Sequence, residues 1–512
     1  MLLFVVQSLH WPMVNDPAQL RYAYFMTNHG MAPYRDLIEI NMPGVYLTNW
    51  VVIHGLGSGP LAWRIFDLLL MVLALLSMLA IAWPYDWFAG IFAAALFILA
   101  HGRDGAMQTG QRDLIIAVMF LCAYAFLFRA MRTGSAWAMF GFGLAAGIAM
   151  TIKPTPIPFV ALLFILAAVY LQRNGRPWLL PVATAFAGLL IPLAAVLAFL
   201  LSEHALGSFI SVFRITLPYY AMLGRKSDGA LFKTLSPSIW GMLGFVLLAA
   251  FWKPGGRTWK AHLRGLGVLV GFPRNRQDWD TWEIKMLGLG ILFGIFTFLG
   301  QGKGMIYHRY PMLAFLLLWG SIQISMALRG GRFARTVGVL AIVYGIVLAP
   351  CYVREADRSV WSTAYIDSLS KNLNQLGGSA LNGKVQCLAT EAECATTLYR
   401  MHLAQATGLF YDYLVFGPAD NPAIQLNRAH FWKELQENPP QVFVVHTNLY
   451  PNRDGYVKLA NWSQFAEYLG DNYTLYADRQ LPISHGLDMA YRIYVRRDPA
   501  AKIPEAITAR LR

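Results

Sequence analysis

The sequence contains little charge: only 14% of its 512 residues are Asp, Glu, Lys or Arg, whereas 56% are hydrophobic. An ordinary soluble domain has roughly 25% charged residues, so a chain of this composition is expected to need lipid around it. The long apolar runs stop near Cys351, and the remainder is mixed, polar and rich in turn residues. This contrast predicts a membrane-embedded body over residues 1–352 and a soluble domain over residues 353–512.

Cysteine is scarce as well. Four cysteines are too few for a disulfide scaffold, and only Cys387 and Cys394, seven positions apart in the polar part, are placed to pair. Two readings stay open here, a disulfide formed in an oxidising compartment or two unrelated thiols. The first residues also lack the basic start and the small-residue cleavage site of a signal peptide.

Acidic residues are outnumbered, with 28 Asp and Glu against 42 Lys and Arg and a formal net charge of +14. A single basic stripe would suggest nucleic acid, but these cations lie mainly in short loops between apolar runs. The excess therefore indicates membrane topology and partners that are anionic lipids or phosphates, with no nucleic acid.

Apolar runs that approach the roughly 20 residues of a crossing helix recur along the chain. The runs are Leu61–Trp83, Trp87–Ala100, Leu114–Ala130, Ala136–Ile152, Ile157–Leu171, Leu179–Leu201, Ile239–Phe251, Ile284–Leu299, Pro311–Leu328 and Val337–Tyr352. The opening run, Met1–Val14, is too short to span unless it tilts or begins upstream. The predicted fold is a polytopic α-helical membrane protein with about 10 or 11 transmembrane helices.

The loops between these runs form two sets. One set is basic and holds Arg129, Arg132, Arg173, Arg176, the loop Lys253–Lys285, Arg329, Arg332 and Arg335. The positive-inside rule places this set in the cytoplasm. The other set, loops 15–60, 102–112, 153–156, 202–238 and 300–309, combines ionisable residues with Gly, Pro and Tyr, which is typical of a site. Counting crossings puts the C-terminal domain on this second, extracytoplasmic face.

The C-terminal part alternates short β-branched or aromatic runs with helical stretches, which predicts an α/β domain with a small, mainly parallel sheet. The predicted strands are Lys384–Ala389, Tyr413–Phe416 and Gln441–His446, and the predicted helices are Ala423–Leu435 and Ser463–Tyr468. No glycine-rich phosphate loop occurs there. We therefore expect this domain to bind an acceptor or to cover a membrane site.

Several ionisable residues lie at helix mouths on the outer face. Asp16 precedes Pro17, so it is either a helix cap or a functional carboxylate, or both. Asp113 has the same two readings, and Asp104 in the same loop competes with it as a second carboxylate. Lys303, His308 and Arg309 share one short loop and can converge on a phosphate, and Lys153 can join them from a neighbouring helix end. The alternative for these four residues is snorkelling to lipid headgroups.

Two further features have simpler readings. The segment Ser202–Ser238 is either an amphipathic stretch lying on the membrane over the carrier lipid or a solvated loop. His29, His54 and His101 lack a metal-ligand spacing, so each is expected to be a polar residue at an interface.

Four motifs follow one another on the predicted outer face. They are Asp16 with Tyr22, Gly30, Pro33–Asp36 and Met42–Tyr46; Gly110–Asp113; Gly147–Ala149 with Lys153-Pro154; and Gln301–Gly304 with Tyr307–Pro311. Together they resemble the GT-C glycosyltransferases of the dolichyl-phosphate-mannose mannosyltransferase and lipid A aminoarabinose transferase type. The resemblance covers residues 15–350. Members of this family often have an Asp-Glu pair in the first loop, whereas here Pro17 follows Asp16.

The resemblance implies an inverting transfer of a hexose or pentose from a polyprenyl-phosphate carrier to an envelope glycolipid, polysaccharide or protein, outside the inner (plasma) membrane. Asp16 matches the catalytic acidic position and is expected to be the general base, with Asp113 or Asp104 as a second catalytic carboxylate. The expected substrate-binding residues are Lys303, His308, Arg309, Lys153, Arg35, Tyr34 and Gln111. The metal requirement is left open: no cofactor is certain, and a divalent metal is a possible one.

Two other functions compete with this interpretation. A transporter or flippase of lipid-linked saccharides would more naturally show inverted repeats and charged or broken helices near mid-membrane, whereas the ionisable residues here collect in loops on one face. A non-catalytic scaffold has no need of Asp16, Asp113 and Lys303 at helix mouths. Liposomes containing the purified protein separate these functions, because transfer marks an enzyme and translocation alone marks a transporter.

Overall fold

The computed structural model describes residues 2–234, 279–358, 362–389, 393–447, 449–451, 455–481 and 490–497. Contacts divide the chain into two compact units. The helical unit contains Met1–Met13, Asn41–Ser202 and Gly224–Trp361, and the mixed unit contains Val14–Ile40, Glu203–Leu223 and Ser362–Arg512. Two stretches from the membrane half of the sequence, which carry Asp16 and the start of the predicted amphipathic segment, thus pack with the C-terminal residues.

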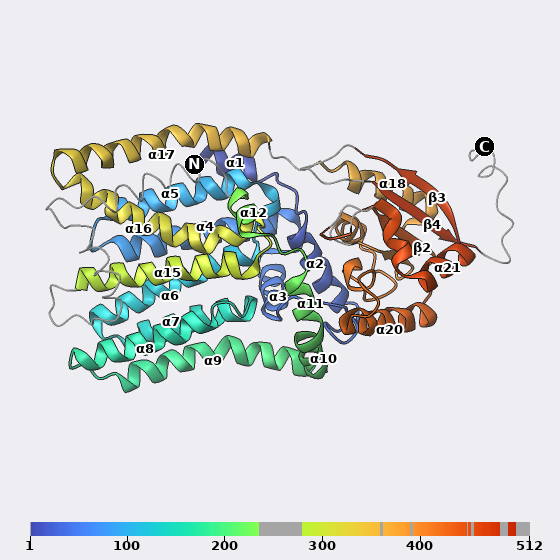
Figure 1. The fold of residues 1–512 in the computed structure, drawn as a ribbon, viewed down its shortest axis with the longest axis horizontal. Coiled ribbons are helices and arrows are strands. Elements are labelled where there is room, and N and C mark those ends of the chain that lie inside the picture. Colours follow the sequence, from blue (N-terminus) through green and yellow to red (C-terminus); the bar gives the residue numbers. More distant parts are fainter. Residues whose placement is uncertain are drawn as a thin grey trace. The chain divides into compact units, whose positions relative to one another are not determined.

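The helical unit is made of long helices that lie side by side and of several short ones (Figure 1). They are α1 (Leu2–Ser8), α3 (Gly44–Leu56), α4 (Pro60–Ala82), α5 (Trp87–Asp104), α6 (Arg112–Thr133), α7 (Ala136–Ile152), α8 (Ile157–Arg173), α9 (Leu179–Ser202), α12 (Asp228–Lys233), α15 (Trp279–Gln301), α16 (Tyr310–Leu328) and α17 (Arg332–Arg358), with the 3₁₀ turns η1 (Ala106–Gln108) and η5 (Ile306–Arg309). Within the described residues, nine of the ten predicted windows are helical. The window Ile239–Phe251 and most of the loop Lys253–Lys285 lie outside those residues.

Burial separates central helices from lipid-facing ones. In the described part of the chain, five helices are long and apolar enough to cross a membrane, and three shorter helices are also apolar. The apolar windows of α6 and α16 are 78% buried, whereas those of α9 and α17 are 22% and 28% buried. A helix that is apolar yet exposed on most of its surface needs an apolar surrounding. The chain is therefore a multi-pass membrane protein, with α6 and α16 at its centre.

Small residues allow the helices to approach closely. A Cβ added at Gly143 of α7 would lie 1.8 Å from the Ala185 carbonyl oxygen of α9, and one added at Gly294 of α15 would lie 2.1 Å from the Met312 Cα. Gly147, which belongs to one of the four motifs, likewise lies against Pro192. Close backbone approach through small residues is the usual way in which membrane helices pack, so Gly147 has a packing role.

The mixed unit combines helices with a four-stranded sheet. Its helices are α2 (Asp16–Thr27), α10 (Leu206–Ser211), the π-helical turn η2 (Val212–Thr216), α11 (Leu217–Met222), α18 (Ala364–Leu376), α19 (Ala395–Arg400), α20 (Pro422–Glu437) and α21 (Ser463–Asn472), with the 3₁₀ turns η6 (Gly378–Leu381), η8 (Asp412–Leu414) and η9 (Gly455–Asn461). The strands are β1 (Val385–Cys387), β2 (Val442–His446), β3 (Tyr473–Arg479) and β4 (Tyr491–Arg496), in the order β1-β2-β4-β3.

The predicted mainly parallel sheet is wrong. Among the four described strands, β1 and β2 are the one parallel pair, whereas β4 pairs antiparallel with both β2 and β3. Only eleven residues separate β3 from β4, which is short for the crossover that parallel neighbours require. Strands β3 and β4 were not among the predicted strands, so the expected sheet rested on runs from the first half of the domain alone.

Of the other predictions for this domain, four elements are confirmed and one strand is wrong. Strands β1 and β2 and helices α20 and α21 lie where they were expected. The predicted strand Tyr413–Phe416 is wrong, because η8 covers its beginning and all four side chains are buried. A short apolar run without alternation does not distinguish a buried strand from a buried turn.

Candidate active site

Three loops meet at one end of the helical unit, where α5, α7 and α15 end and α6 and α16 begin. The loop before α6 has a left-handed residue at Gly110, with φ +59°, and a Cβ there would lie 2.6 Å from the Trp63 ring. Only glycine combines this backbone conformation with such close contact. The Gly110–Asp113 motif is thereby fixed against α4 where α6 begins.

A closed set of hydrogen bonds joins Asp113, Lys153 and Gln301. The Lys153 ammonium donates to Asp113 Oδ2 at 2.5 Å and to Gln301 Oε1 at 2.7 Å, and Gln301 Nε2 donates to Asp113 Oδ1 at 3.1 Å. Asp113 lies in the first turn of α6 and Lys153 at the C-cap of α7, positions where helix dipoles favour an anion and a cation respectively. The structure thus brings together residues from three of the four motifs.

Among the described groups that act electrostatically on His308, beside this set, most are positively charged. His308 is buried, and Asp113, Lys153, Arg112 and Lys303 are the charged groups that act on it electrostatically. Three of these neighbours are cations and one is a carboxylate. Within the described residues, His308 Nδ1 is buried without a hydrogen-bond partner. Cations that gather at the ends of membrane helices favour an anion in the same place.

Arg309 belongs to a different cluster. It forms an ion pair with Asp104, and Tyr310 Oη donates to Asp104 Oδ2 at 3.1 Å. His101 Nδ1 lies 3.0 Å from Tyr310 Oη, and its Nε2 lies 3.0 Å from Asp67 Oδ2. Asp67 pairs in turn with Arg64 and accepts a hydrogen bond from the Gly110 N–H at 2.7 Å.

This second cluster was not predicted. His101, which was expected to be a polar residue at an interface, is completely buried between Asp67 and Tyr310. Arg64 and Asp67 lie inside the window Leu61–Trp83, and charged residues inside an apolar window are themselves a signal of function or pairing. That signal was available in the sequence.

Neighbouring residues of the loop 301–309 therefore interact with two different carboxylates. His308 lies in the field of Asp113, whereas Arg309 is paired with Asp104. Gln111 is buried, and its Nε2 donates to the Met107 carbonyl at 3.0 Å. The substrate-binding roles of these residues stay predictions, and the cluster around Asp113 is the stronger candidate for a phosphate.

Asp16 lies in the mixed unit, where it is the first residue of α2. The N-cap position belongs to Asn15, so the simple reading of Asp16 as the helix cap does not apply. The Asp16 side chain is half-buried. Its predicted role as a general base stays a prediction.

Tyr34 and Arg35 also lie in the mixed unit. Tyr34 is buried in a left-handed conformation, with φ 65°, and its ring lies edge-on to Phe209 at 5.1 Å. Arg35 donates to Asp36 at 2.7 Å and to the Glu203 carbonyl at 3.1 Å. Although burial opposes it, hydrogen bonds from Arg35 and from the Ala32 N–H leave the pKa of Asp36 below its usual value. These contacts hold the loop in shape.

The beginning of the predicted amphipathic segment also belongs to the mixed unit. Over α10, η2 and α11 it exposes the apolar side chains of Ile210, Phe213, Ile215 and Met222. Such a surface fits a segment that lies on a membrane better than it fits a solvated loop.

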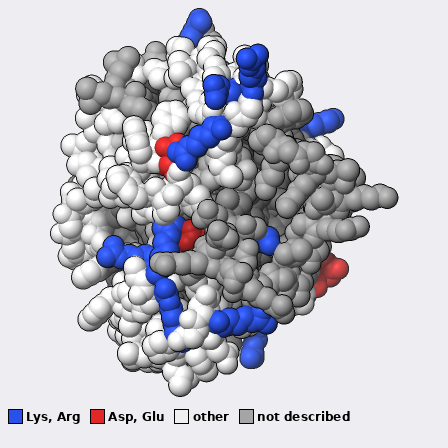
Figure 2. Space-filling model, turned by 90° about the vertical axis from the view of Figure 1, so that its left-hand side faces the viewer, with Lys and Arg blue, Asp and Glu red and all other residues white. Residues whose placement is uncertain are grey.

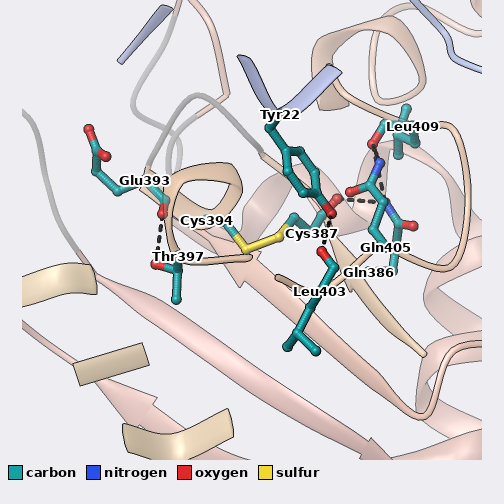
Figure 3. The surroundings of a disulfide bond; sticks show 9 residues. All are labelled: Tyr22, Gln386, Cys387, Glu393, Cys394, Thr397, Leu403, Gln405 and Leu409. Carbon is teal, nitrogen blue, oxygen red and sulfur yellow. Dashed lines mark hydrogen bonds between the residues drawn. A yellow bond between two sulfur atoms is a disulfide. The ribbon is translucent and has the colours of Figure 1, made fainter. Parts of the chain in front are cut away.

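Cys387 and Cys394 form a disulfide that joins β1 to the residue preceding α19 (Figure 3). Of the two readings left open by the sequence, the structure has the paired one. The prediction of a divalent metal is untested. Among the residues described, no three His, Cys, Asp or Glu side chains gather as metal ligands.

The opposite end of the helical unit is basic. Figure 2 shows Lys and Arg side chains spread over this face, with few Asp and Glu between them. Arg132 pairs with Glu283, which also accepts a hydrogen bond from Tyr85 Oη at 2.8 Å, and Arg329 pairs with Asp86 at 3.0 Å. Arg173, Arg332 and Arg335 are exposed. This end is the one that the positive-inside rule assigns to the cytoplasm.

No family model and no curated protein matches the sequence. Among solved structures, ArnT from Cupriavidus metallidurans bound to undecaprenyl phosphate is similar over 98% of both chains, with a TM-score of 0.54 and 15% identity. ArnT in the apo state is similar over 96% of both chains, with a TM-score of 0.55 and 15% identity. An Archaeoglobus fulgidus oligosaccharyltransferase aligns with 86% of this chain and 68% of its own, with a TM-score of 0.46 and 11% identity. The likeness to ArnT concerns the fold alone: the chain has a fold similar to that of ArnT, as the resemblance in its motifs implied.

Proposed function

We propose that the protein is a membrane glycosyltransferase that moves a sugar from a polyprenyl-phosphate carrier to an envelope acceptor. The likeness to ArnT extends over nearly the whole of both chains, and one of its solved structures contains undecaprenyl phosphate. Because fold alone does not define function, the proposal depends on the site. The acceptor is a glycolipid, a polysaccharide or a protein, and the sugar is a hexose or a pentose.

The group of cations around His308 is the observation that carries the proposal. Lys153 is paired with Asp113 at the end of a membrane bundle, and Lys153, Arg112 and Lys303 all act electrostatically on the buried His308. The phosphate that bridges carrier lipid and sugar is an anion of the kind that such a group of cations binds. Charge-assisted hydrogen bonds to phosphate are short and strong, and they strengthen as the phosphate gains charge on leaving.

The reaction needs one base and one anion site. In the proposed step the Asp16 carboxylate takes the proton of the acceptor hydroxyl, whose oxygen attacks the anomeric carbon opposite the phosphate. The bond from that carbon to the phosphate oxygen breaks, and polyprenyl phosphate leaves with the electron pair. The anomeric configuration inverts. Asp16 supplies general-base catalysis, and the cations stabilise the leaving group.

The orientation is part of the same proposal. A disulfide at Cys387 and Cys394 fits an oxidising compartment, and the basic end in Figure 2 fits the cytoplasmic face. Both features support a multi-pass protein of the inner (plasma) membrane whose loops at Asp113 and Lys303 and whose C-terminal residues are extracytoplasmic.

Release of polyprenyl phosphate is the direct test. The full chain in liposomes is given a panel of polyprenyl-phosphate hexoses and pentoses together with an envelope lipid extract, and both free carrier phosphate and glycosylated products are measured. With at least one donor, free carrier phosphate and glycosylated product should form in equal amounts. Translocation of the donor without release would instead identify a transporter of lipid-linked saccharides, and neither outcome with any donor would leave the scaffold interpretation.

A further inference from the structure

The start of helix α2 is held by a residue from far along the chain. The N–H of Asn15, at the N-cap, donates to Glu393 Oε1 at 3.1 Å. In an ordinary capping box this N–H is bound by a Glu or Gln three residues into the same helix. Here that position is Ala18, which has no acceptor, and within the described residues the Asn15 side chain makes no capping bond. Glu393 thus completes the cap from the C-terminal part of the chain.

The backbone on both sides of this contact has an unusual conformation. Asn15 has φ 60° and Glu393 has φ 66°, a region that residues other than glycine seldom adopt. Such conformations persist only where the surroundings determine them, and they cluster at functional sites. The residue that follows Asn15 is Asp16, so the contact determines the direction in which the chain enters α2.

Glu393 is itself firmly held. It is buried and precedes Cys394, which is bonded to Cys387 in β1. Its carbonyl oxygen accepts a hydrogen bond from Thr397 Oγ1 at 2.8 Å, and Figure 3 shows its carboxylate pointing away from the disulfide. On the other side of this disulfide lies Tyr22 of α2, whose Oη donates to the Leu403 carbonyl at 3.0 Å. Helix α2 is therefore fixed to the α19 region at two points, Asn15 and Tyr22.

The role of Glu393 in this contact is geometric. Burial raises its pKa to about 7, although hydrogen bonds from the Thr396 side chain and the Asn15 N–H oppose the shift. Tyr365 of α18 is the other titratable group that interacts with it electrostatically, and no cation does so among the residues described. Whether it is protonated or ionised, the Glu393 carboxyl group has an oxygen that can accept the hydrogen bond from the Asn15 N–H. A glutamine at this position would do the same.

We propose that Glu393 is a positioning residue, which fixes the backbone at Asn15 and so aims the carboxylate of Asp16 at the acceptor hydroxyl. This inference rests on the proposed function, in which Asp16 is the general base. It assigns the positioning of the base to the disulfide-bonded segment of the C-terminal domain. Small misplacements of a catalytic group can lower turnover by roughly a hundredfold, whereas donor binding at the Asp113 cluster does not depend on this contact.

The test compares Glu393→Ala with Glu393→Gln in the full chain. Turnover, donor affinity and amide hydrogen exchange of peptides covering residues 14–20 are measured for each variant. Asp412→Asn is the matched control, because Asp412 is a buried carboxylate of the same unit whose partner is Lys458, at 2.6 Å, and not α2. Turnover is expressed per donor-binding site, so a smaller folded fraction does not count as lost catalysis.

Glu393→Ala should expose the Asn15 amide to exchange and lower turnover about tenfold or more, with donor affinity unchanged. Glu393→Gln should restore both protection and turnover, and Asp412→Asn should alter neither. If Glu393→Ala turns over normally, or if Glu393→Gln is as poor as Glu393→Ala, the positioning role is wrong. Two results together would contradict the proposed function but leave the contact established: the wild-type chain transfers no sugar, and Glu393→Ala still loses the protection of the Asn15 amide that the wild type shows.

Discussion

The two units hold their charged side chains differently. In the helical unit, Asp113, Lys153 and Gln301 form a closed set, and Asp104 binds both Arg309 and Tyr310. In the mixed unit Lys458–Asp412 is a buried pair, but other ion pairs, such as Arg400–Asp367 and Arg492–Asp478, are partly or largely exposed. Water screens the second kind and makes it nearly neutral in energy, whereas a charge among membrane helices is retained only with a partner or a task. Excess charge is therefore informative in the helical unit.

Backbone geometry is the better indicator in the mixed unit. Asn15, Tyr34 and Glu393 all have positive φ: Asn15 precedes Asp16, Tyr34 is itself an expected substrate-binding residue, and Glu393 accepts the hydrogen bond of the Asn15 N–H. The two units thus imply different experiments: charge substitutions in the helical unit should report on donor binding, and substitutions around α2 should report on turnover.

Asp16→Asn gives the largest expected effect. Asparagine keeps the shape of the side chain but cannot accept a proton, so turnover should fall by roughly a hundredfold to ten-thousandfold. Insertion and donor binding should be unchanged. The measurement is sugar transfer by the purified variant beside Asp113→Asn and Asp104→Asn, each checked for monodispersity. Near-normal turnover in Asp16→Asn with an inactive Asp113→Asn or Asp104→Asn would move the base to the loop 102–113.

Arg309→Ala separates the two clusters of the helical unit. Because Arg309 is buried and paired with Asp104, its removal leaves an uncompensated buried carboxylate and should cost about 3 to 5 kcal/mol of stability. Thermal unfolding of the full chain in detergent measures this loss. Arg309→Ala combined with Asp104→Asn should recover much of it. If Arg309→Ala has normal stability but binds the donor poorly, Arg309 contacts the donor phosphate as the sequence predicted.

Lys303→Ala should act on binding. The removal of one cation from a phosphate contact typically costs about 1.5 to 3 kcal/mol, so donor affinity should fall roughly tenfold to a hundredfold with little change in stability. Arg332→Ala at the basic end is the matched control, because Arg332 is exposed and far along the helices from the site end. Unchanged donor affinity in Lys303→Ala would favour the snorkelling interpretation.

Composition and apolar length were sufficient to predict the helices. The predicted windows for α4, α7 and α9 differ from the observed helices by at most a residue or so at either end, because hydrocarbon thickness fixes how long an apolar run must be. Three of the four motifs also meet at the site end, whereas the first motif, with Asp16, belongs to the mixed unit. The pairing of Arg309 with Asp104 was not predictable, since two cations in one loop can turn toward different helices.

The sequence was least informative where distant segments pack together. The mixed unit combines residues 14–40, 203–223 and 362–512, and no local pattern indicates such a combination. The contact between Asn15 and Glu393 joins residues 378 positions apart. Composition separated the apolar half from the polar half and so placed the whole first loop with the membrane body.

The smallest expected effect concerns the pH dependence of stability. The pKa of Glu393 is raised to about 7 because the group is buried, from an ordinary value of 4.5. In the unfolded chain this carboxyl ionises near 4.5, whereas in the folded chain it stays protonated until about pH 7. The stability that the protonated Glu393 contributes is therefore fully present below pH 4.5 and is lost as the pH rises toward 7. Above pH 7 this group causes no further change in stability.

Glu393→Gln removes this dependence. A shift of this size sets an upper limit of about 3 kcal/mol, but the glutamine amide brings an N–H group to the position of Oε2, an atom without a hydrogen-bond partner in the described part of the chain. After the cost of burying that donor, Glu393→Gln should be more stable than wild type by on the order of 1 kcal/mol at pH 8. At pH 5 the variant should be the less stable of the two proteins. The difference in melting temperature between wild type and variant, measured from pH 5 to pH 9 in full chains, isolates this group because the other titrations cancel. A difference that is flat with pH would show that Glu393 is ionised in the folded protein throughout, and its bond to the Asn15 N–H would then depend on charge as well as on position.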